Sequence, residues 1–370
     1  MAPTVLAATR KGLFFIKRDS RRWKIESAAL LGDPVTMVLA CGDAIHAAQD
    51  MGHFGVKLKR SLDRGDTWEE RPVPTYPPKP EDEHDVDPVR NAPVPWSLKT
   101  VWSLEHGGPG ESDELWCGTI PGGLFRSRDG GNSWSLVESL WNHPQRKQWF
   151  GGGADFPGIH SILVDPQDAR VIRIGVSCAG LWVSRDDGAT WQCEGKGMRA
   201  EYMPADLALE PSVQDPHRVV QCREAPDHIW IQHHNGIFRS TDGGVTCTEI
   251  ETAEPSAFGF AVVVHPDDPQ RAWFVPGVKD QQRYPVDGAL VVSRTRNGGD
   301  SFEILREGLP QKHAYDVVYR HGLDIDESGD RLAFGTTTGN LWVSEDQGDH
   351  WQQVSQNLPP IYCVRFASVA

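Results

Sequence analysis

A short motif occurs six times along this chain and constrains its fold more than any other feature. The motif reads Ser-x-Asp-x-Gly-x-Thr-Trp or a close variant. Its central position is filled, in chain order, by Asp63, Asp129, Asp186, Asp242, Asn297 and Asp346. Because such a repeat builds one structural unit per copy, the motif predicts a repeat architecture before any single element is assigned.

The residues around each copy indicate what the motif does. Apolar residues alternate before it, as in 180–183, and after it, as in 134–137, which is the pattern of two strands joined by a turn. The Asp carboxylate can accept hydrogen bonds from N–H groups of the turn, and the glycine can adopt a positive φ without steric cost. The aromatic ring at the end can pack between neighbouring sheets. The motif is therefore predicted to be a structural corner rather than a catalytic site.

The spacing of the motif gives the size of the repeating unit. Successive central residues lie 49 to 66 positions apart, enough for one propeller blade of roughly 40–50 residues and its loops. The chain starts in mid-blade, since residues 4–9 and 12–16 have the pattern of second and third strands. Residues 361–367 are expected to supply the missing inner strand, which would close the ring and protect its strand edges. We predict an all-β, seven-bladed propeller of four-stranded antiparallel blades, forming one domain over residues 1–370.

The motif resembles the Asp-box, or BNR, repeat of sialidases and many other β-propellers. Over its whole length the chain is similar to bacterial propellers commonly named exo-α-sialidase or YVTN/BNR-like. A sialidase resemblance implies three arginines on a substrate carboxylate, a Tyr nucleophile assisted by a Glu, and an Asp acid/base. Candidates for such roles are Arg10, Arg283, Tyr202 with Glu201, and Tyr315 with Asp316. The F/Y-R-I-P start of that family is missing and Arg320 is expected to point to the opposite face, so true sialidase activity is not expected.

Charge and composition exclude several classes of partner. The formal net charge of −14 disfavours binding to nucleic acid or to anionic membranes. No apolar run approaches the roughly 18 residues of a membrane span. The seven cysteines include no Cys-x-x-Cys pair, and the start of the chain lacks the basic and apolar regions of a signal peptide. We therefore expect reduced thiols and a cytoplasmic location.

Four long connections are expected on one face of the ring. They join an outer strand to the next inner strand and comprise residues 71–95, 138–160, 195–217 and 311–315. Polar strand ends, such as residues 49–53 and 279–284, should point to the same face. Because loops on a rigid scaffold usually carry function, we expect them to wall a pocket around the central axis.

The candidate site residues are the polar side chains of these loops and strand ends. His160, His313, Asp155 and Glu201 are the predicted catalytic residues, and Arg10, Lys99, Lys279, Arg283 and Tyr315 the predicted substrate-binding residues. Imidazoles that meet near the axis can hold a divalent metal such as Zn²⁺ or Mn²⁺, with His160, His217, His233 and His234 as the predicted ligands. The acidic run Asp82, Glu83, Asp85 and Asp87 is a candidate for Ca²⁺, against a solvated loop as the alternative.

The sequence leaves two functions of different class open. The first is a hydrolase or lyase that acts on a carbohydrate-like or other polar small molecule in the axial pocket. The alternative is a non-catalytic propeller scaffold that binds a protein partner. An enzyme predicts a deep polar pocket with clustered histidines and carboxylates, whereas a scaffold predicts a broad, shallow face with exposed apolar or single-signed patches.

Overall fold

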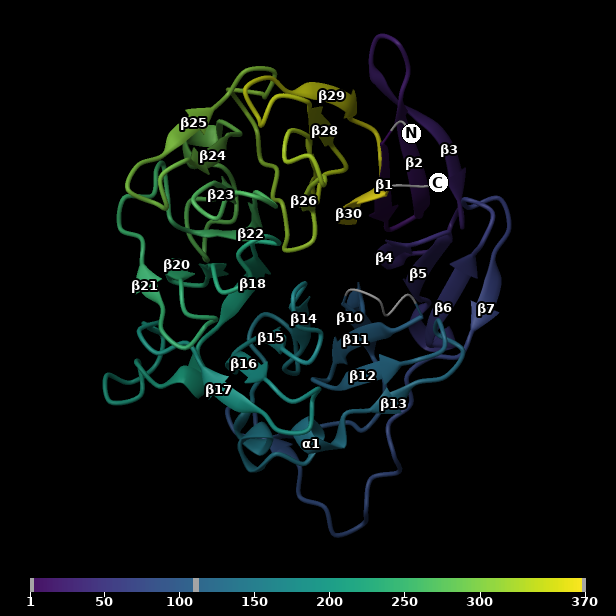
Figure 1. The fold of residues 1–370 in the computed structure, drawn as a ribbon, viewed down its shortest axis with the longest axis vertical. Coiled ribbons are helices and arrows are strands. Elements are labelled where there is room, and N and C mark those ends of the chain that lie inside the picture. The colour runs from purple at the N-terminus through teal and green to yellow at the C-terminus, as the bar shows by residue number, and fades with distance from the viewer. Residues whose placement is uncertain (1–2, 109–112, 368–370) are drawn as a thin grey trace.

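The computed structural model describes residues 3–108 and 113–367 and shows seven four-stranded antiparallel sheets arranged as blades around one axis (Figure 1). The predicted fold class is confirmed. Met1 and Ala2 lie outside the described residues. They belong to the segment that was expected to lack the features of a signal peptide. The extent of the domain over residues 1–370 therefore stays a prediction.

The blades follow one another along the chain, and each runs from an inner strand at the axis to an outer strand at the rim. The first blade is β30 (Ile361–Ala367), β1 (Thr4–Thr9), β2 (Gly12–Arg18) and β3 (Trp23–Ala29). The second is β4 (Val35–Cys41), β5 (Ala44–Asp50), β6 (Val56–Ser61) and β7 (Glu69–Arg71), and the third is β10 (Thr100–His106), β11 (Leu115–Ile120), β12 (Leu124–Ser127) and β13 (Ser135–Leu136). The fourth is β14 (Ile159–Val164), β15 (Ile172–Val176), β16 (Gly180–Ser184) and β17 (Gln192–Glu194), and the fifth is β18 (Pro216–Gln221), β19 (Ile229–His233), β20 (Gly236–Ser240) and β21 (Thr248–Glu249). The sixth is β22 (Gly259–Val264), β23 (Ala272–Pro276), β24 (Val292–Thr295) and β25 (Glu303–Leu305), and the seventh is β26 (Leu323–Ile325), β27 (Leu332–Gly335), β28 (Leu341–Ser344) and β29 (Gln352–Ser355).

The C-terminal strand closes the ring as the sequence predicts. β30 pairs antiparallel with β1, from Thr4 opposite Ala367 to Thr9 opposite Ile361. Both ends of the chain consequently lie at the same blade (Figure 1). Since β1 has β2 on its other side, neither of its edges is left open.

The repeated motif forms the corner between the third and the fourth strand of a blade. In the second copy, Asp129 Oδ1 accepts hydrogen bonds from the N–H groups of Asn132 (2.9 Å) and Ser133 (2.8 Å) and from the hydroxyl of Ser127 (2.8 Å). In the altered fifth copy, Asn297 Oδ1 still accepts from Ser301 N–H (3.1 Å). The structural role predicted for the motif thus agrees with its geometry.

Large aromatic side chains fill the space between blades. The fully buried tryptophans include Trp116, Trp182, Trp230, Trp273 and Trp342. Trp230 of the fifth blade lies edge-on to Phe274 of the sixth, with ring centroids 5.8 Å apart. Such rings bury a large apolar area between neighbouring sheets, which makes the ring a continuous core.

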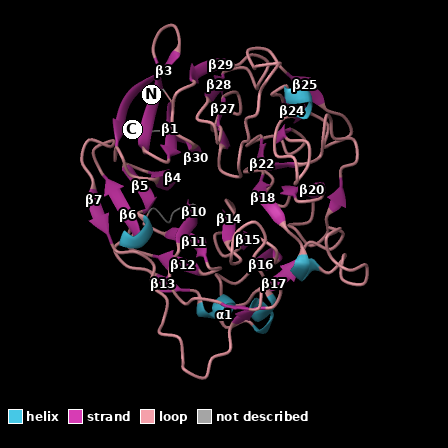
Figure 2. Ribbon diagram, turned by 180° about the vertical axis from the view of Figure 1, so that it is seen from behind, coloured by secondary structure: helices cyan, strands magenta, loops and turns pink. Residues whose placement is uncertain are grey.

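The connections add short elements around the ring. The loop before the third blade forms a small sheet of β8 (Val86–Asp87) and β9 (Ala92–Pro93). Helical turns are α1 (Glu138–Trp141), η1 (Gly52–Phe54), η2 (Pro144–Gln148), η3 (Pro211–Val213) and η4 (Val286–Gly288). α1 lies at the periphery of the ring in Figure 2. In the described part of the chain, no helix has the length and apolar character needed to cross a membrane.

Candidate functional site

A cavity of about 1150 Å³ opens at the axis of the ring. Its walls include Arg10, Asp33, Thr36, Asp50, Phe54, Thr100, Trp102, Phe150, Cys178, Tyr202, Asp215, His217, His234, Phe260, Asp280, Arg283, Tyr319, Arg320, His321 and Tyr362. These residues come from several blades and from the loops that join them. The pocket expected at the axis is therefore present in the structure.

Irregular positions in the inner strands place several of these side chains. The pairing register shifts at Thr36 in β4, Trp102 in β10, His217 in β18 and Tyr362 in β30. In β22 the shift falls between Gly259 and Val262 and includes Phe260. Because a bulge re-aims the side chain of the extra residue, the same irregularity in blade after blade gathers side chains at the axis.

Three arginines, Arg10, Arg283 and Arg320, line the cavity, and two of them lie against aromatic rings. The Arg320 guanidinium lies 4.7 Å from the ring centroid of Trp102, and its Nε is buried without a hydrogen-bond partner among the described residues. Arg283 lies 5.3 Å from the ring centroid of Phe260 and pairs with Asp280 at 2.5 Å. Such planar cations on aromatic faces suit an anionic or strongly polar ligand. Arg320 precedes β26 instead of ending an inner strand, so the expectation that it points to the opposite face was wrong.

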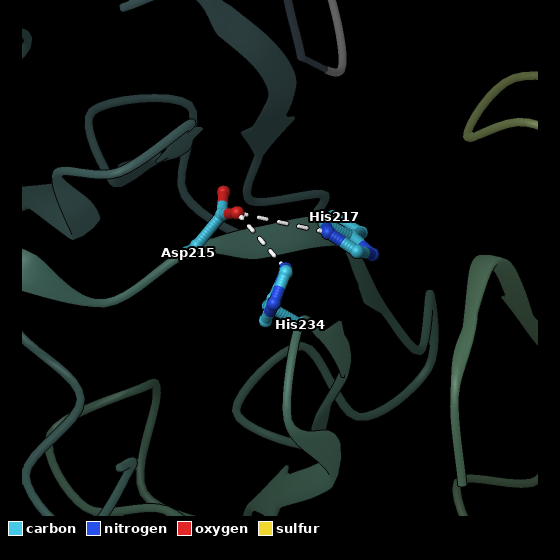
Figure 3. Close-up of side chains that lie close together, drawn as sticks. All are labelled: Asp215, His217 and His234. Atoms are coloured by element: carbon cyan, nitrogen blue, oxygen red, sulfur yellow. Dashed lines mark ion pairs between the residues drawn. The ribbon is translucent and has the colours of Figure 1, made fainter. Parts of the chain in front are cut away.

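A carboxylate and two imidazoles meet on one wall of the cavity (Figure 3). Asp215 Oδ2 lies 3.7 Å from His217 Nε2 and 3.6 Å from His234 Nδ1. The other oxygen, Oδ1, accepts from Cys178 N–H at 3.2 Å. His217 Nδ1 lies 2.7 Å from the carbonyl oxygen of Gly259, and its ring stacks on Phe260 at 4.5 Å.

The charges in this cluster follow from burial and from the neighbouring cation. Burial by itself raises the pKa of Asp215, but His217 and Arg320 oppose it more strongly and hold the pKa below its ordinary value. Burial lowers the pKa of His217 by more than the Asp215 carboxylate raises it. The environment of the cluster therefore favours the ionised form of the Asp215 carboxylate.

Two further carboxylates lie at neighbouring positions of the second blade. Asp33 precedes β4 and accepts from Gln49 Nε2 at 3.1 Å, whereas Asp50 ends β5 and accepts from Gly52 N–H and Thr100 Oγ1, both at 3.1 Å. The Asp50 N–H donates to Pro34 O at 3.2 Å, which fixes the two segments side by side.

Four of the predicted site residues line the axial cavity. They are Arg10, Arg283, His217 and His234. The structure brings the two arginines to the cavity as the prediction requires and places both histidines beside Asp215. Their roles in binding or catalysis stay predictions.

Two predicted histidines lie behind the wall instead. His160 is fully buried, edge-on to Trp102, and is not among the described residues that line the cavity. His233 is also fully buried, and backbone N–H groups of Asp215 (3.0 Å) and Asn235 (3.1 Å) point at its two ring nitrogens. The predicted metal set is therefore not assembled as a whole, because both rings are buried in the core, His160 at the register shift of β14 and His233 in the regular pairing of β19.

The remaining predicted residues lie outside the axial cavity. Lys99 and Lys279 are exposed, as are Asp155, which pairs with Arg90 at 3.2 Å, and Glu201, which pairs with Arg199. His313 and Tyr315 line a second cavity of about 540 Å³ near Tyr284 and η4. Neighbours of these residues, such as Ala154, Tyr202 and Asp280, line the axial cavity, so it is the individual side chains and not their whole loops that lie outside it.

The long connections also differ from expectation in what they cover. Residues 71–95 do not line the cavity. They pack against residues 138–160, where Asp85 and Arg146 form a buried ion pair of 2.8 Å. Asp87 accepts from Gly151 N–H at 2.7 Å, and Glu83 pairs with Lys147 at 2.7 Å. These carboxylates are thus bound to protein donors, which argues against the Ca²⁺ candidate, and the burial of Asp85 and Asp87 differs from the solvated loop that was the alternative.

Sequence reasoning overlooked several residues that the cavity contains. Asp33, Trp102 and Tyr362 were not among the candidates, and Asp215 was noted only as part of a loop. The one sequence signal that could have found a part of the site is the Asp215-Pro216-His217 tripeptide, which sets an acid two residues from a histidine just as a strand begins.

Comparison with known proteins adds a distant relationship. No protein-family model matches the chain. It is 24% identical over 259 residues to an oligoxyloglucan-reducing end-specific xyloglucanase of Emericella nidulans, in a match that covers 68% of this chain and 27% of that enzyme. A xyloglucanase of a Paenibacillus species is 28% identical over 148 residues, covering 35% of this chain and 13% of the enzyme. The chain is a propeller distantly related to xyloglucanases. It spans about a quarter or less of the length of these curated relatives.

Solved structures share the propeller fold at low identity. The GH74 xyloglucanase of Xanthomonas campestris aligns with a TM-score of 0.60 and 18% identity, over 98% of this chain and 52% of that one. The periplasmic gluconolactonase of Pseudomonas aeruginosa aligns with a TM-score of 0.60 and 11% identity over the whole of both chains. YCF48 bound to D1 peptide aligns with a TM-score of 0.52 and 15% identity, over 89% of this chain and 85% of that one. At these identities the likeness concerns the fold alone.

Proposed function

We propose that this protein is a glycoside hydrolase that acts in its axial cavity on an oligosaccharide resembling xyloglucan. The observation that carries the proposal is the lining of that cavity, where aromatic rings and carboxylates face one space. The relationship to xyloglucanases gives the class of substrate.

The size and the walls of the cavity suit a sugar chain. A volume of about 1150 Å³ lies slightly above the roughly 300–1000 Å³ of small-molecule sites, which leaves room for more than one sugar unit. Trp102, Tyr319 and Tyr362 offer rings with an apolar face and a polar tip. Such rings suit a ligand whose faces carry C–H groups and whose edges carry hydroxyls.

Asp33 and Asp50 are the carboxylate pair that we assign to catalysis. Glycoside hydrolysis uses two carboxyl groups roughly 5–10 Å apart, one as acid and one as base or nucleophile. Asp33 and Asp50 stand on neighbouring segments of one blade, and paired strands lie about 4.8 Å apart. Gly52 N–H and Thr100 Oγ1 hold the Asp50 carboxylate in place, and we assign it the role of base or nucleophile. Asp33 is then the acid that protonates the leaving oxygen.

The test is hydrolysis of reducing-end-labelled xyloglucan oligosaccharides, followed by mass spectrometry of the products. Asp50→Asn and Asp33→Asn should each lower kcat at least about a hundredfold, as expected for loss of an acid or base. Asp43→Asn is the matched control, because Asp43 is an exposed residue in the β4–β5 turn of the same blade. Turnover that is unchanged in both cavity variants would refute the assignment of the pair.

A second candidate function is the binding of a peptide through its terminal carboxylate. The buried, unpartnered Nε of Arg320 favours it, since Arg10 and Arg283 line the same cavity and could surround one anion. Fluorescently labelled peptides with a free or an amidated C-terminus distinguish this function. Binding of only the free form, lost in Arg320→Met, would support the scaffold, whereas equal binding of both forms would count against it.

A further inference from the structure

We propose that Asp215, His217 and His234 bind one divalent transition-metal ion at the wall of the axial cavity. The inference goes beyond the proposed hydrolase, which requires only carboxylates. It rests on the positions of three ligand atoms, on the hydrogen bond behind one of them and on the space in front of them.

The ligand atoms have the spacing of a metal site rather than of a hydrogen-bonded cluster. A carboxylate and an imidazole that share a proton lie about 2.7–3.0 Å apart. The Asp215 oxygen instead stands 3.7 Å from His217 Nε2 and 3.6 Å from His234 Nδ1, and the three atoms lie within 4.8 Å of one another. Tetrahedral ligands at bonds of about 2.1 Å are separated by roughly 3.4 Å, so an ion fits between the Asp215 oxygen and each imidazole nitrogen with little adjustment.

The surroundings of His217 fix the orientation of its ring and the position of its proton, as a metal ligand requires. Its Nδ1 lies 2.7 Å from the Gly259 carbonyl oxygen, which can only accept, so Nδ1 carries the proton. The lone pair of the neutral ring is then on Nε2, the atom that faces Asp215. A second ring nitrogen bound to a carbonyl is the usual support of a metal-binding histidine, because it fixes both the tautomer and the orientation.

Asp215 is prepared in the same way. It is 5% exposed, and Cys178 N–H donates to the oxygen that faces away from the two imidazoles. Stacking on Phe260 holds the His217 ring in place at the bulge of β18. The ligand side chains are thus held in place without a metal, which lowers the free-energy cost of ordering them when a metal binds.

The set of ligands and its location indicate what the ion would do. Two histidines and one carboxylate are a common ligand set for Zn²⁺ and for Fe²⁺, and such sites leave coordination positions open for water or substrate. All three residues line the cavity, so an open position would face its contents. Arg320 and Arg283 line the same space. A polar or anionic oxygen of the ligand would therefore be held between the ion and a guanidinium.

The test is metal binding by the full chain, measured without any sugar. Protein stripped with a chelator is titrated with Zn²⁺ by calorimetry and with Co²⁺ by visible absorption. We expect one equivalent per chain and ligand-field bands of bound Co²⁺. Affinity should fall at least about a hundredfold in His217→Ala and His234→Ala, and Asp215→Asn should weaken it too. His313→Ala, in the second cavity, is the matched control and should bind as the wild type does.

Folding of each variant is checked by thermal unfolding. Should His217→Ala fail to fold, the half-buried His234 gives the decisive variant, because its loss disturbs the core less. Absence of one-equivalent binding and of Co²⁺ bands in the wild type overturns the proposal, as does affinity that is unchanged in folded His234→Ala. Sugar hydrolysis without metal would leave the proposed function standing, and metal binding without hydrolysis would leave this site standing, so the two can fail separately.

Discussion

At the scale of single residues, the Asp of each corner acts through its charge as well as its hydrogen bonds. Asp129 collects backbone and hydroxyl donors, and these lower its pKa from 3.8 to about 2, the hydroxyl of Ser133 contributing most. The same position in the fifth corner holds Asn297, which keeps the acceptor oxygen without the charge. One corner of the chain is thus formed without a charged side chain at this position.

This contrast makes a prediction for acid stability. Because the pKa of Asp129 is lower in the folded protein, its contribution is present above about pH 4 and is lost as the pH falls toward 2. Asp129→Asn should retain the corner, as Asn297 does, but should flatten the fall of Tm between pH 4 and pH 2. Thermal unfolding across this range measures the slope. Identical slopes in wild type and variant would contradict this role of the charge.

At the scale of elements, the loop of residues 71–95 is anchored by a buried charge pair. Asp85 and Arg146 are 1% and 6% exposed and lie 2.8 Å apart. Removal of one partner leaves the other charge buried and unpaired, so Asp85→Ala should lower the free energy of unfolding by about 3–5 kcal/mol. Glu83→Ala, which breaks the exposed pair with Lys147, should cost about 0–1 kcal/mol. Urea unfolding measures the loss of stability in each variant. Equal losses in the two variants would show that the buried pair does not anchor the loop.

Ring closure gives a second prediction at this scale. β30 covers the edge of β1, and Arg365 of β30 reaches Glu105 on β10. A chain that ends at residue 360 should therefore expose the β1 edge and associate through it. Size-exclusion chromatography should show aggregates for this truncation and a wild-type profile for a chain that ends at residue 367. A soluble, native-like product of the shorter chain would show that closure is not required.

The elements also explain why the fold was more predictable than the site. Strand alternation, corners and the unpaired segment 361–367 are local signals, and they predicted β1, β2 and β30 at nearly their observed bounds. The cavity depends on bulges, and one extra residue changes which side chain faces the axis. His217, at the shift of β18, reaches the cavity, whereas His160, at the equivalent shift of β14, and His233, on the strand that pairs with β18, lie in the core.

Long-range packing limited the prediction in a different way. His313 and Asp155 are in connections expected to cover the axis, yet His313 lies at the second cavity and Asp155 at an exposed ion pair with Arg90. Arg320 shows the reverse, since it was expected to point to the opposite face and yet reaches the cavity from the segment that precedes β26. Loop paths of this kind are set by contacts such as Asp85 with Arg146, which a single sequence does not reveal.

At the scale of the whole molecule, we infer that one axial cavity is the working site of the ring. The cavity gathers aromatic rings, the Asp33 and Asp50 pair and the Asp215 cluster from different blades. The most direct test is a crystal structure of Asp50→Asn soaked with a xyloglucan oligosaccharide. We expect sugar in the axial cavity, against Trp102 and Tyr362. An oligosaccharide bound in the second cavity or on the outer strands, with the axial cavity free of it, would contradict the inference.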